Sequence, residues 1–208
     1  MKSAESYLAY IVHSIHTAIV ATVDEDGLPV TCAIDMMDAD ESSLYFLTAR
    51  GKRFYDRLKR QGSIAFTALK GNDTMHSIAV SVRGKAEEIG PERIPELFAK
   101  NPYMNDIYPD ERSRSVLTAF RIFEGNGEWF DLSAHPIERA EFSFGGAAER
   151  REGYYVTDRC IGCRLCYSRC PQKSIDITVK PAVIQQEHCI RCGGCAEICP
   201  AHAIERRQ

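Results

Sequence analysis

The sequence predicts a mainly β protein with a few helices (α+β): a small barrel of six or seven strands within residues 1–145, followed by a separate cysteine-rich unit. Three observations predict this organisation. Strand-like segments follow one another with few helices between them, no G-x-G-x-x-G follows a strand, and eight of the nine cysteines lie between Cys160 and Cys199. The first two favour a barrel over a doubly wound sheet, and the third marks a second functional unit.

The first unit is expected to begin with a helix over 4–15, which Ser3 can cap. Strands at 17–23 and 28–36 with a turn between them form a hairpin signature. The next elements are strands at 43–48, 63–70 and 77–89 and helices at 51–60 and 91–100. Segments 115–123 and 127–132 resemble a closing hairpin that turns at 124–126. Small, charged residues at 146–153 are expected to link this unit to residues 154–208.

Composition excludes several classes of protein. The 208 residues are 44% hydrophobic and 26% charged with net charge −3, which is typical of a globular protein and offers no electrostatic basis for binding nucleic acid. No run of eighteen apolar residues is present, so no membrane segment is expected. The first six residues, Met1 to Ser6, lack the apolar core of a signal peptide. We therefore expect a cytoplasmic protein whose cysteines bind metal or clusters instead of forming disulfides.

The cysteines form a repeated motif. Cys160-x-x-Cys163-x-x-Cys166-x-x-x-Cys170-Pro recurs 29 residues later as Cys189-x-x-Cys192-x-x-Cys195-x-x-x-Cys199-Pro. Three closely spaced thiolates can surround one corner of a cubane, while the following helix carries the fourth cysteine to the other cluster. The expected ligand sets are Cys160, Cys163, Cys166 and Cys199 for one 4Fe–4S cluster, and Cys189, Cys192, Cys195 and Cys170 for the other.

This segment resembles a bacterial two-cluster ferredoxin. A ferredoxin-like α+β unit with two 4Fe–4S clusters would also explain how so few large apolar residues can fold, because the clusters would replace much of the core. Two structural zinc ions are the alternative, since Cys-x-x-Cys pairs also bind zinc. The third cysteine and the trailing Cys-Pro in both copies favour clusters.

A candidate phosphate site lies where the third strand runs into a helix. Thr48, Arg50, Gly51 and Lys52 place a hydroxyl, two cations and a glycine at a helix N-terminus, where the helix dipole favours anions. The alternative is a solvated basic start of a helix.

The order of these segments resembles the pyridoxamine 5'-phosphate oxidase-like family of FMN-binding split barrels, over nearly all of residues 1–145. The resemblance implies a homodimer with an FMN in each of two grooves at the subunit interface, and with Thr48, Arg50 and Lys52 on the FMN phosphate. It further implies that the strand Thr31, Cys32, Ala33 and Ile34 runs beside the flavin ring and that Ser81 or Arg83 approaches it. The substrate-binding C-terminal segment of the vitamin B6 oxidases has no match here, so oxidation of pyridoxamine phosphate is not predicted.

Together these features predict an iron–sulfur flavoprotein oxidoreductase. Electrons would pass between two 4Fe–4S clusters and FMN to reduce or oxidise a small-molecule substrate, with a ferredoxin- or flavodoxin-type protein as redox partner. Two alternatives stay open: a non-enzymatic electron carrier, and a split barrel that binds haem or another ligand. No residue is predicted to be catalytic.

Overall fold

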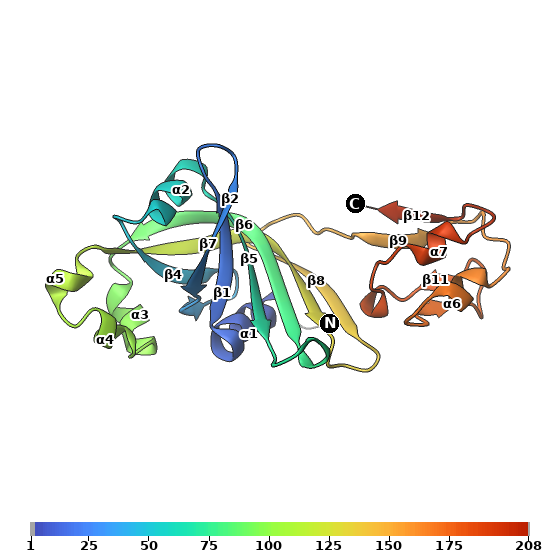
Figure 1. Ribbon diagram of the computed structural model, residues 1–208, viewed down its shortest axis with the longest axis horizontal. Coiled ribbons are helices and arrows are strands. Elements are labelled where there is room, and N and C mark those ends of the chain that lie inside the picture. Colours follow the sequence, from blue (N-terminus) through green and yellow to red (C-terminus); the bar gives the residue numbers. More distant parts are fainter. Residues whose placement is uncertain (1–2, 208) are drawn as a thin grey trace.

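The computed structural model describes residues 3–207, which form an eight-stranded antiparallel sheet and a smaller C-terminal unit (Figure 1). The strands of the large sheet hydrogen-bond in the order β2-β1-β5-β6-β7-β4-β3, and β8 pairs with the second half of β7. Their bounds are β1 (Thr17–Val23), β2 (Pro29–Asp35), β3 (Asp38–Ala39), β4 (Leu44–Ala49), β5 (Ser63–Lys70), β6 (Ile78–Gly90), β7 (Leu117–Asp131) and β8 (Glu138–Phe144).

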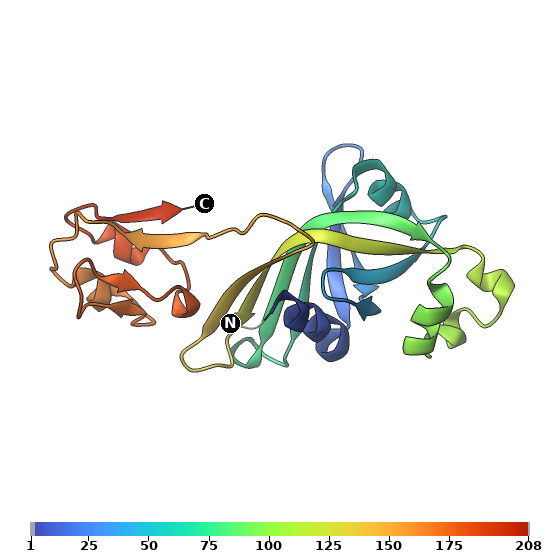
Figure 2. The same ribbon diagram turned by 180° about the vertical axis from the view of Figure 1, so that it is seen from behind.

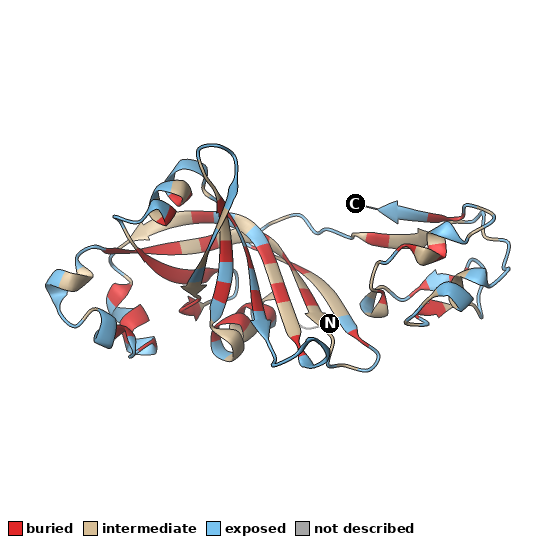
Figure 3. Cartoon of the chain, viewed as in Figure 1, coloured by how far each residue is buried: buried red, intermediate tan, exposed pale blue. Residues whose placement is uncertain are grey.

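The large sheet curls so that its ends approach each other: β2 and β4, far apart in the strand order, are in contact. Helix α2 (Arg53–Gln61) packs against β1, β4 and β6 and buries Phe54 and Leu58 in the core. Buried and exposed residues alternate along β1 and β5 (Figure 3), so one face of the sheet encloses the core and the other stays open. The predicted fold class is confirmed. The sheet has eight strands because β3 and β8 were not foreseen and the expected segments 115–123 and 127–132 form the single strand β7.

Helices also pack against this sheet at the N-terminal end of the chain and between β6 and β7. Ser3 accepts a hydrogen bond from the Ser6 N–H at 3.2 Å and starts α1 (Ala4–Tyr10), which continues as the π-helical segment η1 (Ile11–Ile15). The capped helix expected over 4–15 is therefore confirmed. The short η2 (Thr74–His76) joins β5 to β6, and α3 (Ile94–Lys100), α4 (Met104–Ile107) and α5 (Glu111–Arg114) join β6 to β7 and lie beside a second apolar cluster. Helix α3 begins at Ile94, later than the expected start at residue 91.

The hairpin expected to turn at 124–126 is wrong, because β7 runs through those residues without a turn. The glycines there serve the sheet instead. A Cβ on Gly127 would come within 2.1 Å of the Phe142 ring, and one on Gly125 within 2.8 Å of the Phe144 ring. Both phenylalanines lie on β8, so the glycines let the aromatic rings pack over the strand. The closing hairpin of the sheet is formed by β7 and β8.

The C-terminal unit contains two small sheets, two short α-helices and one 3₁₀ turn, and an extended segment joins it to the barrel (Figures 1 and 2). Its elements are β9 (Gly153–Val156), which pairs with β12 (Ile204–Arg207), β10 (Ile175–Asp176), which pairs with β11 (Val183–Ile184), and α6 (Leu165–Arg169), η3 (Gln186–His188) and α7 (Gly194–Glu197). Helices α6 and α7 contact each other and start 29 residues apart, so the sequence repeat is also a structural repeat.

Candidate functional site

Two cavities in the C-terminal unit are each lined by four cysteines. The first is bordered by Cys160, Cys163, Cys166 and Cys199, and the second by Cys170, Cys189, Cys192 and Cys195. All eight are free thiols. Each cavity therefore gathers three cysteines from one copy of the motif and the fourth from the other copy, which is the exchange expected for a two-cluster protein.

The backbone of the two motif copies is shaped alike. Left-handed φ values occur at equivalent positions 29 residues apart: at Gly162 and Arg191, and at Arg164 and Gly193. Glycine adopts this conformation without strain, whereas for an arginine it costs about 1–2 kcal/mol. Each copy thus holds one arginine where its counterpart holds glycine. The cost of this conformation indicates that each arginine side chain can make contacts that glycine could not make.

The thiols are arranged around a volume and do not converge on a point. Within residues 3–207, no three His, Cys, Asp or Glu side chains are placed to hold a single metal ion. Burial raises the pKa of Cys195 to about 11 and also raises the pKa of Cys189. The pKa of Cys170 is lowered although burial opposes its ionisation, because the Ser174 hydroxyl and backbone N–H groups hydrogen-bond its sulfur. Thiols spread in this way suit a polynuclear cluster, whose positive irons would stabilise the thiolates, better than one zinc ion.

The candidate phosphate corner lies at the end of β4 and the start of α2. The Thr48 hydroxyl is buried and has no hydrogen-bond partner among the described residues. Space is open beside Gly51, where an added Cβ would meet no atom within 4 Å, and the exposed Lys52 is the N-cap residue of α2, without a side-chain cap. An unsatisfied hydroxyl, an accessible backbone and a cation at a helix start fit a phosphate group. Arg50 instead donates to the backbone carbonyls of Ser115 and Leu117 at the start of β7.

A groove of about 580 Å³ lies on the open face of the sheet. It is lined by three of the residues expected near the flavin, Thr31, Ser81 and Arg83, and also by residues of β7, β8, the linker and the C-terminal unit. Ser81 shares a 2.9 Å hydrogen bond with Thr67, and Arg83 forms a 2.9 Å ion pair with Glu152 of the linker.

The expected flavin-binding residues of β2 divide between the two faces of the strand. Thr31 and Ala33 are exposed on the open face, whereas Cys32 and Ile34 pack against the core. Burial raises the pKa of the Cys32 thiol, and the nearby cations Arg57 and Lys52 partly offset this shift, so Cys32 lies on the α2 side of the strand. One chain therefore places the phosphate corner and the groove on opposite faces of β2.

A network of charges joins the C-terminal unit to the barrel at the rim of the groove. Arg191, between Cys189 and Cys192, donates to Glu141 on β8 at 2.7 Å and to Glu128 on β7 at 3.3 Å. Arg139 donates to the same Glu128 oxygen at 2.6 Å. These side chains are largely buried: 17% of the Arg191 side chain and 12% of the Arg139 side chain are exposed.

A second contact at this rim links His188 Nδ1 with the Ile137 carbonyl oxygen at 2.8 Å. Neither His188 nor any member of the charge network was predicted from the sequence as a site residue. One signal was present for Arg191, because it stands where the other copy of the motif has Gly162.

Sequence comparison identifies the barrel. The profile of the pyridoxamine 5'-phosphate oxidase family matches residues 5–133, more than half of the chain. The chain belongs to this family. Beyond the barrel, this family member continues into a 4Fe–4S dicluster domain, whose profile matches residues 153–200. The C-terminal unit is thus of the iron–sulfur electron-transfer type.

Curated relatives match a short stretch of this family member. A subunit of the ion-translocating oxidoreductase complex of Methanosarcina acetivorans is 50% identical over 48 residues, which are 23% of this chain and 18% of that protein. The pyruvate synthase subunit PorD of Methanothermobacter marburgensis is 44% identical over 48 residues, which are 23% of this chain and 56% of that protein. The chain therefore spans less than two thirds of the length of either relative.

Solved structures share the fold of the barrel. A NimC/NimA family protein of Clostridium acetobutylicum has a TM-score of 0.55 at 14% identity, covering 67% of this chain and 92% of that chain. A pyridoxamine 5'-phosphate oxidase-related, FMN-binding protein of Nostoc punctiforme has a TM-score of 0.52 at 11% identity, covering 69% and 96%. A haem-binding protein of Mycobacterium smegmatis has a TM-score of 0.53 at 14% identity, covering 71% and 62%. At these identities the likeness concerns the fold alone. None of the helices within residues 3–207 has the length and apolar character needed to cross a bilayer.

Proposed function

We propose that this chain is an iron–sulfur flavoprotein oxidoreductase that passes electrons between two 4Fe–4S clusters and FMN to reduce or oxidise a small substrate. The proposed units are the barrel, residues 1–145, the linker, 146–153, and the cluster domain, 154–208. One observation carries the proposal: Arg191 stands between two proposed cluster ligands and lines the same groove as Thr31, Ser81 and Arg83. The groove proposed for the flavin ring therefore lies beside the nearer of the two proposed clusters.

The cysteines around each cavity would hold one cluster each, with the ligand sets that line the two cavities. Thr48, Gly51 and Lys52 would hold the FMN phosphate, with Arg50 behind them on the backbone of β7. FMN, when bound, supplies the conversion between one-electron and two-electron chemistry. The chain contributes position and electrostatics, and no side chain is proposed as a general acid.

The proposed working form is a homodimer. The phosphate corner and the groove residue Thr31 lie on opposite faces of β2, so one flavin that contacts both sets requires them to come from two chains. The open face of the sheet also exposes apolar side chains, with 55% of Ile19 and 60% of Leu69 accessible. Because eight thiols must stay reduced until clusters assemble, we propose a cytoplasmic location.

The runner-up function is an electron carrier without a small-molecule substrate, in which the flavin buffers electrons between proteins. Haem is less favoured as the ligand, because none of the described residues lining the groove is His, Cys, Met or Tyr, the usual axial ligands of haem iron.

The test is anaerobic stopped-flow reduction of the full-length protein with a one-electron donor. We expect cluster reduction first and flavin bleaching at the same or a later time, and we expect Cys189→Ser to slow flavin bleaching. Bleaching at the wild-type rate in that variant would contradict transfer through the clusters. Steady-state turnover of small acceptors supports the enzyme, and turnover of protein acceptors alone supports the carrier.

A further inference from the structure

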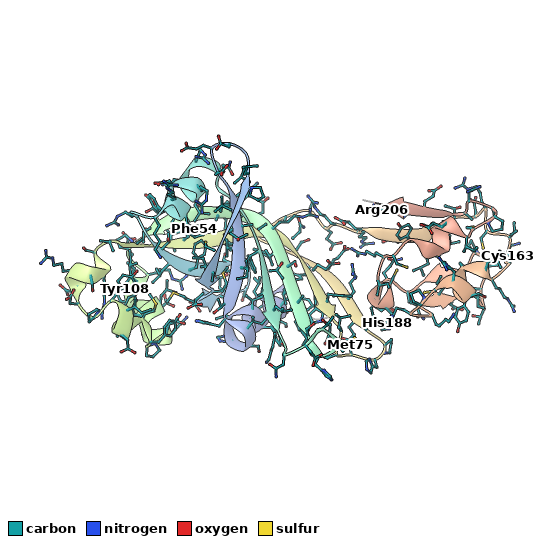
Figure 4. The ribbon with its side chains drawn as sticks, in the orientation of Figure 1. Phe54, Met75, Tyr108, Cys163, His188 and Arg206 are labelled. Carbon is teal, nitrogen blue, oxygen red and sulfur yellow. The ribbon has the colours of Figure 1, made fainter. Side chains whose placement is uncertain are left out.

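The two ends of the C-terminal unit have different surroundings. The cavity bordered by Cys170, Cys189, Cys192 and Cys195 faces the barrel, because Arg191 and His188 next to it contact β7, β8 and the loop before β8. In Figure 4, His188 lies on the side of the unit that faces the barrel, and Cys163 lies at the far tip of the molecule. The cavity that includes Cys163 is therefore the distal one.

The distal cavity has an exposed apolar rim. Ile161 and Val179, which line it, are 59% and 49% exposed, and Leu165 at the start of α6 is 43% exposed. Cys163, one of its four thiols, is itself exposed. A cluster held there would lie close to the surface, where a protein partner could approach it within electron-transfer distance.

The same rim carries positive charge. Arg164 lines the cavity, and the Lys180 side chain passes beside Gly162, whose added Cβ would lie 3.7 Å from the Lys180 Cδ. Within residues 3–207 neither Arg164 nor Lys180 forms an ion pair, so both charges are available to a partner. Arg164 also keeps a left-handed backbone, φ 64°, at the position where the other copy has Gly193. At the barrel-facing end the other left-handed arginine, Arg191, which stands at the position of Gly162, binds carboxylates.

We propose that the distal rim, formed by Ile161, Cys163, Arg164, Leu165, Val179 and Lys180, is the docking surface for an acidic one-electron carrier protein. One electron would leave the reduced carrier and reduce a cluster held in the distal cavity. It would then pass to a cluster held in the barrel-facing cavity beside the groove. No bond forms or breaks, and no proton is required. The reverse flow uses the same surface. This inference rests on the proposed function, because it needs both clusters to be present.

The test measures how fast two reductants reduce the clusters of the full-length, cluster-loaded protein in anaerobic stopped flow. The probes are a reduced, acidic plant-type 2Fe–2S ferredoxin and photoreduced 5-deazariboflavin, which is small and uncharged. The variants are Arg164→Gly, which copies Gly193 and relaxes the backbone, and Lys180→Glu. The control is Arg112→Glu on α5, an exposed charge reversal on the barrel.

We expect Arg164→Gly and Lys180→Glu each to slow reduction by the ferredoxin several-fold, and the double variant by about tenfold or more at low ionic strength. The wild-type rate should fall with added salt and the double-variant rate should not. Reduction by deazariboflavin, and every rate of Arg112→Glu, should stay unchanged. Ferredoxin rates that are equal in all proteins and insensitive to salt would overturn the docking surface while leaving the proposed function intact. A protein without clusters would instead contradict the proposed function itself.

Discussion

The hydrogen bonds of Arg191 to Glu141 and Glu128, called the bridge below, can be tested directly. The other copy of the motif shows which residue the backbone accepts at this position, namely glycine. Arg191→Gly copies Gly162, so relief of about 1–2 kcal/mol of left-handed strain offsets the added flexibility of glycine, about 0.5–1 kcal/mol. The unit should therefore fold as well as before. The variant loses two hydrogen bonds to Glu141 and Glu128.

The size of the loss follows from the burial of the bridge. Exposed ion pairs contribute about 0–1 kcal/mol, and breaking a buried pair costs about 3–5 kcal/mol. With 17% of the Arg191 side chain and 24% of the Glu141 side chain exposed, we expect docking to weaken by about 1–3 kcal/mol. That corresponds to a shift of about 5- to 150-fold in the ratio of undocked to docked molecules.

Hydrogen exchange read by mass spectrometry measures this shift, because β8 and η3 contact each other across the interface. Exchange in both segments should accelerate in Arg191→Gly and in Glu141→Gln, which leaves the cysteine loop untouched. Exchange in β1 should not change. Arg159→Ala is the matched control, since its partner Glu205 lies within the same unit. Unchanged exchange in β8 and η3 of both variants, at normal iron content, would refute the bridge.

Three further predictions concern the barrel and the cysteines. Thr48→Val should leave the flavin-free protein as stable as before, because the Thr48 hydroxyl has no hydrogen-bond partner among the described residues, but it should weaken FMN binding about tenfold. The control is Thr118→Val, because the Thr118 hydroxyl donates to Glu88 at 2.8 Å. This variant should lower the free energy of unfolding by about 1–3 kcal/mol in denaturant titrations. Burial alone would raise the pKa of Glu88, but hydrogen bonds from Lys59, Thr118 and Tyr55 lower this pKa below the usual 4.5. Ionised Glu88 therefore stabilises the fold above pH 4.5, and this stabilisation is lost as the pH falls towards the lowered pKa of the folded state. Glu88→Gln should therefore be less stable than wild type at pH 7, and the difference should shrink in melts below pH 4.5; a constant difference would contradict this. Cys189→Ser should lose about half of the iron and acid-labile sulfide in chemical assays, whereas Cys32→Ser, in the barrel, should lose none.

The repeat of cysteines was the most predictable feature, because ligand spacing is a local property of the sequence. That spacing alone predicts which four cysteines meet in each cavity. The strand-like runs at 17–23 and 63–70 likewise predicted β1 and β5 with their observed bounds. Both cases depend on neighbours in the chain.

Features that depend on distant contacts were not predictable. Gly125 looks like a turn residue, but Gly125 and the nearby Gly127 are glycines because phenylalanines of β8 lie over them. The residues of β2 expected to bind flavin form one run in the sequence, but the pleat places Thr31 and Cys32 on opposite faces. In the sequence, Arg191 resembles a solvent-exposed cation in a cysteine loop, and only the fold shows its carboxylate partners on the barrel.

The most direct test of the whole account is the cofactor content of protein purified without oxygen. Two clusters and one flavin in each chain predict about eight iron atoms, about eight acid-labile sulfides and one FMN per chain, with FMN identified by mass after denaturation. Zinc in place of iron, or iron without flavin, would contradict the claim that this chain couples two clusters to a flavin barrel.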